Sequence, residues 1–390
     1  MKCLLVLMML VIAIGMCGSL DAANPFFAKW KTPFGVPPFG EIELEHYQPA
    51  FEEAMKQHNQ EISAIYKKRS APTFENTIAA MDRSGALLNR VSAVFFAMRS
   101  SMTNEQIEAI AKVIAPKLSK HQDEILLNEL LFQRVAAVYR NKDAEPLTSD
   151  QEKLLEETYK DFVRGGAELP KDKKERLKEI NAELSLLSLK FGENVLKETN
   201  KFELVIEDEA DLSGLPDGVI AAASETAKER GKPGKWVFTL DKPSMIPLLQ
   251  YSTKRNLREK IFTAYINMGN NDDELDNKST LAKMAALRAE RAQVLGYETH
   301  AHYVLEKNMA KQPTNVYERL HQLWTPALKR AKDEVAEMQK LNDEEGGDFK
   351  LKPWDRWYYA EKVKKAKYDL DEEMLRPYFK LENDRQGAVD

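Results

Sequence analysis

The chain has 390 residues, of which 43% are hydrophobic and 31% are charged, and its formal net charge is −5 at pH 7. This profile is typical of a soluble globular protein with a densely charged surface, and it favours helices over a β-sandwich. Because the charge balance is acidic and no basic stripe stands out, nucleic acid is excluded as an expected partner.

The first 22 residues have the pattern of a secretory signal peptide. A lysine at position 2 is followed by an apolar run over residues 3–18 and by small residues at 22–23. The run is short for a bilayer crossing and charged sequence follows it, so no membrane span is expected after cleavage. We therefore expect an exported, periplasmic protein. Lipid attachment through Cys17 is the alternative, although Met16 stands where a small residue is usual.

Cys3 and Cys17 are the only cysteines, and both lie inside this leader. The mature chain is therefore expected to form no disulfide, no thiolate nucleophile and no cysteine-bound zinc. A cysteine-free chain suits an oxidising compartment. Its stability has to come from core burial.

An arm rich in proline and aromatic residues follows over residues 24–45, with the sequence NPFFAKWKTPFGVPPFGEIELE. Four prolines in this span rule out a continuous helix. We expect an extended arm. Its aromatic side chains should pack on the helical body, because exposing all of them to water would be costly.

Helical periodicity then runs from Pro49, placed like a first-turn proline, to about Glu198. Thr73 precedes a helical run through Met98. Pro116 should kink or end the helix in which it lies.

Two capping boxes and a pair of glycines mark helix ends in the same stretch. The boxes pair Thr103 with Gln106 and Ser149 with Glu152. Gly165-Gly166 should end the helix that starts at the second box. The clearest helical period follows, over residues 177–195.

Residues 200–245 break the helical rhythm with two β-type runs, FELVI at 202–206 and KWVFTL at 235–240. Helix resumes near Pro247 and continues to Gln339, residues 342–348 form a loop, and the last helical stretch begins near Pro353. We predict a mostly α fold with a small β insertion. The domain plan is 1–22, signal peptide; 23–199, arm and helical domain; 200–245, insertion; and 246–390, a helical segment.

No zinc-hydrolase motif is present in the sequence. H-E-x-x-H places two imidazoles one helical turn apart, with a glutamate between them. None of the six histidines (His46, His58, His121, His300, His302 and His321) has a second histidine four residues away. His300 and His302 are two apart, which puts them on nearly opposite faces of a helix. Ordinary surface or core-edge histidines are the preferred interpretation.

Other catalytic and binding templates are also missing. The sequence has no G-x-S-x-G and no G-x-G-x-x-G, and GKPGK at 231–235 lacks P-loop spacing, so it should be a loop tip. NNDDELDNK at 270–278 lacks the glycine and glutamate of a calcium loop and should be the polar start of a helix. No carboxylate stands in an apolar setting that would raise its pKa. We therefore predict no catalytic and no metal-binding residue, and the substrate-binding residues stay unknown.

Five separated blocks resemble the peptidyl-dipeptidases, or dipeptidyl carboxypeptidases, of the thimet-oligopeptidase-like zinc metallopeptidases. The blocks are 24–55, PTFENTIAAMDRSG at 72–85, 242–270, 281–310 and KPWDRWYYAEKVKKAKYDLDEEMLRPYF at 352–379. They cover nearly the whole mature chain in the family's order. The resemblance implies a helical lobe of a channel-type enzyme that releases dipeptides from the carboxyl end of oligopeptides, with zinc as cofactor.

The family places its zinc helix after the stretch that matches YFKLENDRQG, so no family metal ligand or catalytic residue can be assigned to this chain. We expect the amino-terminal half of such an enzyme, inactive alone, with the missing carboxyl-terminal half as its packing partner. The alternative is a non-catalytic helical module that binds peptides or a partner protein. A structural helical protein unrelated to peptidases is a third option.

Four aromatic residues, Trp354, Trp357, Tyr358 and Tyr359, gather in six positions near the end of the sequence. We expect these rings to be interface material for the missing half. The alternative is that they pack on the aromatic arm.

Overall fold

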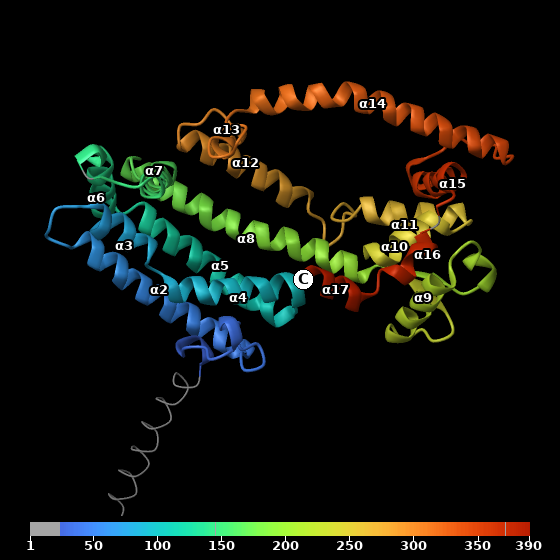
Figure 1. Cartoon of the computed structure of the whole chain (residues 1–390), viewed down its shortest axis with the longest axis horizontal. Coiled ribbons are helices and arrows are strands. Elements are labelled where there is room, and N and C mark those ends of the chain that lie inside the picture. Colours follow the sequence, from blue (N-terminus) through green and yellow to red (C-terminus); the bar gives the residue numbers. More distant parts are fainter. Residues whose placement is uncertain (1–23, 145, 371) are drawn as a thin grey trace, which may run out of the picture. The chain divides into compact units, whose positions relative to one another are not determined.

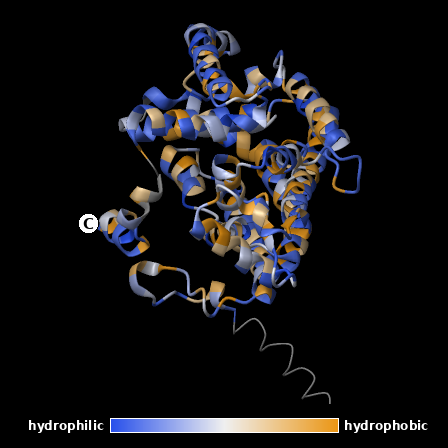
Figure 2. Ribbon diagram, turned by 90° about the vertical axis from the view of Figure 1, so that its right-hand side faces the viewer, coloured by the Kyte–Doolittle hydropathy of each residue, from blue (hydrophilic) through white to orange (hydrophobic). Residues whose placement is uncertain are grey.

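The structure is a computed structural model that describes residues 24–144, 146–370 and 372–390, so the predicted signal peptide lies outside the described residues. As predicted, the chain is mostly helical with one small sheet (Figure 1). Hydrophobic and hydrophilic positions alternate along the helices, as expected of amphipathic elements (Figure 2). Among the described helices, none combines the length and apolarity needed to cross a bilayer.

The chain forms two compact units. The first contains the described part of residues 1–190 together with Ala282–Tyr303, and the second contains Phe191–Leu281 and Val304–Asp390. The predicted domain plan, with boundaries at 199/200 and 245/246, stays a prediction beside this division into two units. The chain passes from one unit to the other inside helices, where composition gives no signal.

The first unit begins with two 3-10 turns, Pro25–Phe27 and Pro33–Gly35, and includes a π-helical turn, Phe74–Ile78. Its helices are α2 (Leu44–Tyr66), α3 (Ala79–Asp82), α4 (Ala86–Met102), α5 (Glu105–Leu126), α6 (Glu129–Arg140) and α7 (Ser149–Arg164). Three helices have residues in both units: α8 (Lys171–Lys201), α12 (Lys278–Val294) and α13 (His300–Leu305).

The second unit contains strands β1 (Leu204–Ile206) and β2 (Trp236–Phe238). Its helices are α9 (Asp217–Glu229), α10 (Lys242–Tyr251), α11 (Arg255–Ile266), α14 (Pro313–Glu344), α15 (Arg356–Tyr368), α16 (Glu372–Leu375) and α17 (Leu381–Val389). The strands pair antiparallel with Val205 opposite Val237. This confirms the predicted sheet, but α9 between the strands was not predicted.

The aromatic arm packs on the first unit through its first half. The ring of Phe26 is fully buried, 5.5 Å from the ring of Tyr47 on α2. Burying such a ring contributes roughly 2–3 kcal/mol. Phe34 instead has positive φ, 58°, in the second 3-10 turn and is fully exposed. The expectation that the aromatics pack on the body therefore holds for Phe26 and is wrong for Phe34.

Helix α2 begins at Leu44, five residues before the predicted start at Pro49. Glu43 and His46 form the capping box, in which the backbone N–H of Glu43 donates to His46 Nδ1 at 2.9 Å. Pro49 therefore lies inside the helix and removes one backbone hydrogen bond. Burial of the Tyr47 and Phe51 side chains on the same helix offsets that loss.

The run predicted from Thr73 to Met98 is interrupted at Gly85, which has a φ of +71° and separates α3 from α4. A Cβ at this position would lie 3.1 Å from the ring of His58. The left-handed backbone and the adjacent ring together explain why glycine occupies this break.

Both predicted capping boxes are one residue out of place. Asn104 caps α5, and Thr148 caps α7 with Gln151 as its partner. Asn104 caps its helix by accepting from the backbone N–H of Ile107, without a box partner, whereas Thr148 and Gln151 form the same pattern one residue before the predicted pair. Helix α5 also continues through Pro116, which therefore does not end it.

Later helix ends agree better with the sequence. Helix α7 ends before Gly165 and Gly166 as predicted, and the final helical stretch begins next to Pro353. Helix α14 extends to Glu344, three residues into the loop predicted at 342–348.

Candidate functional site

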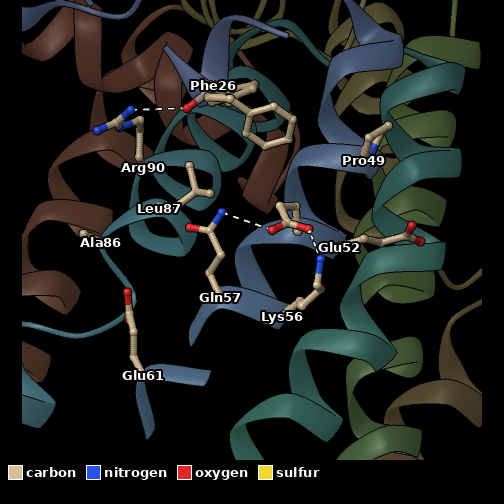
Figure 3. A pocket seen from close by; sticks show the side chains of 11 residues that line it. Phe26, Pro49, Glu52, Lys56, Gln57, Glu61, Ala86, Leu87 and Arg90 are labelled. Carbon is tan, nitrogen blue, oxygen red and sulfur yellow. Dashed lines mark hydrogen bonds and ion pairs between the residues drawn. The ribbon is translucent and has the colours of Figure 1, made fainter. Parts of the chain in front are cut away.

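The first unit carries a pocket of about 750 Å³ between the aromatic arm, α2 and α4 (Figure 3). It is lined by Phe26, Phe27, Pro49, Glu52, Glu53, Lys56, Gln57, Glu61, Ala86, Leu87 and Arg90. Arg90 fixes one wall, since its Nη1 donates to the carbonyl oxygens of Phe26 at 3.2 Å and Ala28 at 3.3 Å. The arm thus forms part of the site.

The carboxylates of this pocket are paired within the chain. Glu53 accepts from Lys56 Nζ at 2.8 Å and from Gln57 Nε2 at 3.2 Å, and the hydrogen bond from Lys56 lowers the pKa of Glu53. A hydrogen bond from Lys117 likewise lowers the pKa of Glu52. These groups stay ionised at neutral pH, so they can bind polar ligands but are poor proton donors.

A chain of hydrogen bonds joins two histidines next to the pocket. Ser84 Oγ donates to the Met81 carbonyl at 2.6 Å, so it must accept from His58 Nε2 at 3.1 Å. His58 Nδ1 then accepts from His121 Nε2 at 2.9 Å. This leaves His121 Nδ1 as a buried acceptor without a partner. Burial lowers the pKa of both imidazoles, so the pair is neutral at pH 7.

The other histidine pair considered in the sequence does not converge. His300 and His302 lie on α13, as expected from helical spacing, and His302 Nδ1 lies 2.9 Å from Thr299 Oγ1. Over residues 24–144, 146–370 and 372–390, no three or more histidine, cysteine or acidic side chains are grouped so that they could hold a metal ion.

Within the acidic stretch 270–278, a lysine forms ion pairs with two aspartates. Lys278 Nζ lies 2.6 Å from Asp272 and 2.8 Å from Asp276, and Asp276 also accepts from the backbone N–H of Lys278. These bonds lower the pKa of Asp276 to about 2. The predicted polar helix start is confirmed, because α12 begins at Lys278.

One carboxylate contradicts the prediction that no pKa is raised. Asp123 on α5 is 6% exposed, and burial raises its pKa to about 6 in spite of a 2.8 Å hydrogen bond from Asn181 Nδ2. The sequence around Asp123 does not differ from that of exposed acidic positions on other helices, so its burial could not be predicted from the sequence. It lines none of the pockets described for this unit.

The aromatic residues near the end of the sequence surround a buried ion cluster in the second unit. Asp355 is fully buried and accepts from Arg255 Nη2 and Arg258 Nη2, each at 2.9 Å. The Arg258 guanidinium lies 4.3 Å from the Tyr358 ring centre.

Tyr359 is also covered in this unit, and its hydroxyl donates to Asn342 on α14 at 2.7 Å. Trp357 packs 6.0 Å from Phe262 on α11. Of the four rings, that of Tyr359 is buried and those of Trp354, Trp357 and Tyr358 are partly exposed, so their role as interface material for a further segment stays a prediction. Within this unit, the cluster packs against α11 and α14.

The chain is similar to known peptidases over most of its length. A family model described as peptidase family M3 matches residues 248–389. The chain is 36% identical to the dipeptidyl carboxypeptidase of Escherichia coli over 362 residues, which are 93% of this chain and 53% of that protein.

Two further relatives show the same coverage. Identity is 33% to the dipeptidyl carboxypeptidase of Salmonella typhimurium, over 94% of this chain and 54% of that protein. It is 32% to oligopeptidase A of Haemophilus influenzae, over 88% of this chain and 51% of that protein. The chain spans about half the length of the curated relatives it matches. By these similarities the chain resembles peptidases of family M3.

Proposed function

We propose that this chain forms the helical half of an M3 peptidase that releases dipeptides from the carboxyl end of oligopeptides, and that it works together with a further segment carrying the metal site. The observation that carries the proposal is the similarity to dipeptidyl carboxypeptidases over 93% of the chain but only 53% of the relative. The remaining part of such a relative has no counterpart among these residues.

The metal site is the feature that requires a further segment. M3 peptidases are zinc metallopeptidases, in which zinc activates a water molecule for attack on the peptide bond. The described residues do not fit a zinc ion, because no three suitable side chains converge among them. In this proposal the chain binds and orients the peptide, and the further segment supplies the metal ligands.

Complementation tests the proposal. The chain is mixed or co-expressed with the part of E. coli dipeptidyl carboxypeptidase that lies beyond the aligned region, and dipeptide release from a short peptide is followed by mass spectrometry. We expect zinc-dependent release from the mixture and none from either part alone. Release by the chain alone with one bound zinc, or no release from the mixture, would contradict the proposal.

A peptide-binding module without catalysis is the second candidate, and the pocket of the first unit favours it. Its wall combines apolar Phe26 and Leu87 with ionised Glu53 and Arg90, which suits a short peptide with charged ends. Peptide binding by the chain alone, with a loss on Arg90→Ala, combined with failed complementation, would favour this candidate.

We also propose that the protein is exported and that residues 1–22 are removed. Support comes from the lysine at position 2 and the apolar run that follows it. Expression in a bacterial host, with fractionation and intact-mass analysis, tests this. A periplasmic product that starts near Ala23 is expected, and an uncleaved cytoplasmic product would refute it.

A further inference from the structure

Helix α14 is unusual in this structure because most of its length is exposed to solvent. Every residue from Tyr317 to Ala336 is exposed, whereas the end of the helix packs on α15 (Figure 1). Twenty residues correspond to roughly 30 Å of helix. In proteins, most of a helix's stability comes from packing of its amphipathic face on other elements. The exposed part of α14 is therefore a segment that a further element should support.

The exposed part carries a continuous apolar stripe. Large apolar side chains recur at three- and four-residue spacing, with Ala331 filling the one small position: Tyr317, Leu320, Trp324, Leu328 and Val335. At 100° per residue these positions share one face of the helix. Tyr317 and Trp324 are each 63% exposed, which is a large area of aromatic surface to leave in water.

The stripe leads into a groove that is already formed. Leu328 and Val335 on α14 face Phe349 and Leu351, and the groove between them measures about 930 Å³. Its far wall is held in place, since the Arg255 guanidinium lies 4.3 Å from the Phe349 ring centre and Leu351 N donates to Gln339 Oε1 at 2.9 Å. A side chain at one end of a docked helix could enter this groove without reorganising it.

The chemistry of the face fits a protein helix. Aromatic and leucine side chains form its centre, as they do in buried interface cores. Its charges are mixed, with Glu318 and Lys332 on the same flank, so the face lacks the uniformly basic rim that favours an anionic lipid surface. A partner helix with an apolar stripe of the same period could lie alongside α14 and bury this stripe.

We propose that this face of α14 is the packing surface for an amphipathic helix of the further segment that completes the M3 peptidase. The inference rests on the proposed function. The face lies within residues 248–389, the part that the family model matches, and the curated relatives are about twice as long as the aligned region. A second copy of the chain is the competing occupant, and the test distinguishes it.

Thiol labelling tests the surface, because the chain has no cysteine after Cys17. Trp324→Cys is compared with Gln322→Cys in a chain that starts at residue 23. The two positions are two residues, or about 200°, apart on the helix. Maleimide labelling rates are measured for the chain alone and after mixing with the remaining part of E. coli dipeptidyl carboxypeptidase. We expect at least tenfold protection of Trp324→Cys and less than twofold protection of Gln322→Cys.

Each other result decides against the inference. A complex that releases dipeptides while Trp324→Cys labels freely would move the docking surface elsewhere and leave the proposed function standing. Failure to form any complex would contradict both. Concentration-dependent protection in the chain alone, with a dimer mass in sedimentation, would assign the face to a second copy.

A charge-reversal pair provides an independent measurement. Leu320→Glu places a carboxylate in the stripe, and Lys329→Glu places one on the opposite side of the helix. Both positions are exposed, so both variants should fold, which circular dichroism verifies. We expect Leu320→Glu to weaken the complex at least tenfold and Lys329→Glu less than twofold. Equal effects would contradict the assignment.

Discussion

Replacing Asp355 by asparagine tests the contribution of the buried ion cluster to the stability of the second unit. The carboxylate accepts from Arg255 Nη2 and Arg258 Nη2 at 2.9 Å and from the Lys352 backbone N–H at 2.9 Å. Asparagine keeps the shape and one acceptor but removes the charge. Arg255 is 32% exposed and can be hydrated, whereas Arg258 is 2% exposed and cannot. The change therefore leaves one buried guanidinium without its counter-charge.

Breaking a buried ion pair in this way costs about 3–5 kcal/mol, and we expect the lower end because one of the two arginines reaches water. The free energy of unfolding is measured by urea titration followed by tryptophan fluorescence, since Trp354 and Trp357 flank the cluster. The matched control is Arg330→Gln, which removes an exposed pair with Glu334 on α14 and should lower the free energy of unfolding far less than Asp355→Asn.

A double replacement separates charge imbalance from lost packing. Asp355→Leu alone should be strongly destabilising, and adding Arg258→Met should recover most of the loss, because an apolar pair can replace a buried ion pair. The reasoning would be refuted if Asp355→Asn cost no more than Arg330→Gln. It would also be refuted if Arg258→Met made the double variant worse.

Three further predictions concern the first unit. Gly85→Ala should lower the free energy of unfolding by about 1–3 kcal/mol because of the left-handed backbone and the adjacent His58 ring. Gly231→Ala is the control, since Gly231 has the same φ of +71° but open space around it, and this change should cost less. If both variants lowered the urea midpoint equally, the ring contact would be excluded as a cause. Burial raises the pKa of Asp123 in the folded state to about 6. Between about pH 4 and pH 6 the folded state therefore keeps this proton while the unfolded state has lost it, so the free energy of unfolding decreases as the pH rises through this range. Asp123→Asn should abolish that decline, and an unchanged slope of unfolding free energy against pH would contradict it. The His58–His121 pair has lowered pKa values, so its stabilising effect is lost as pH falls below about 6.5. His121→Gln, whose amide can still donate to His58 Nδ1, should flatten this acid limb in urea titrations between pH 5 and 7, and a limb as steep as in the parent would count against it.

Local signals in the sequence predicted the helical fold well. Amphipathic period and the glycine pair at 165–166 placed α7 and α8, and β-branched and aromatic runs placed both strands. The errors were local too. Thr148 and Ser149 are both good caps with a suitable partner three residues on, and the sequence alone does not choose between them. The tendency of Pro49 and Pro116 to begin or end a helix was overcome because neighbouring side chains on the same helices are buried.

The polar clusters could not be found from the sequence because they join distant segments. His58 and His121 are 63 residues apart, and Arg255 and Asp355 are 100 apart. In a chain with 31% charged residues, a buried aspartate is indistinguishable from its exposed neighbours until the helices are packed.

Dipeptide release measured with and without the further segment tests the division of labour most directly. Each sample contains added zinc, and metal content is determined on the same protein. The account predicts that the chain alone retains no stoichiometric zinc and releases nothing, and that the mixture with the remaining part of the E. coli relative binds one zinc and releases dipeptides. One zinc bound by this chain alone, with dipeptides released, would contradict it.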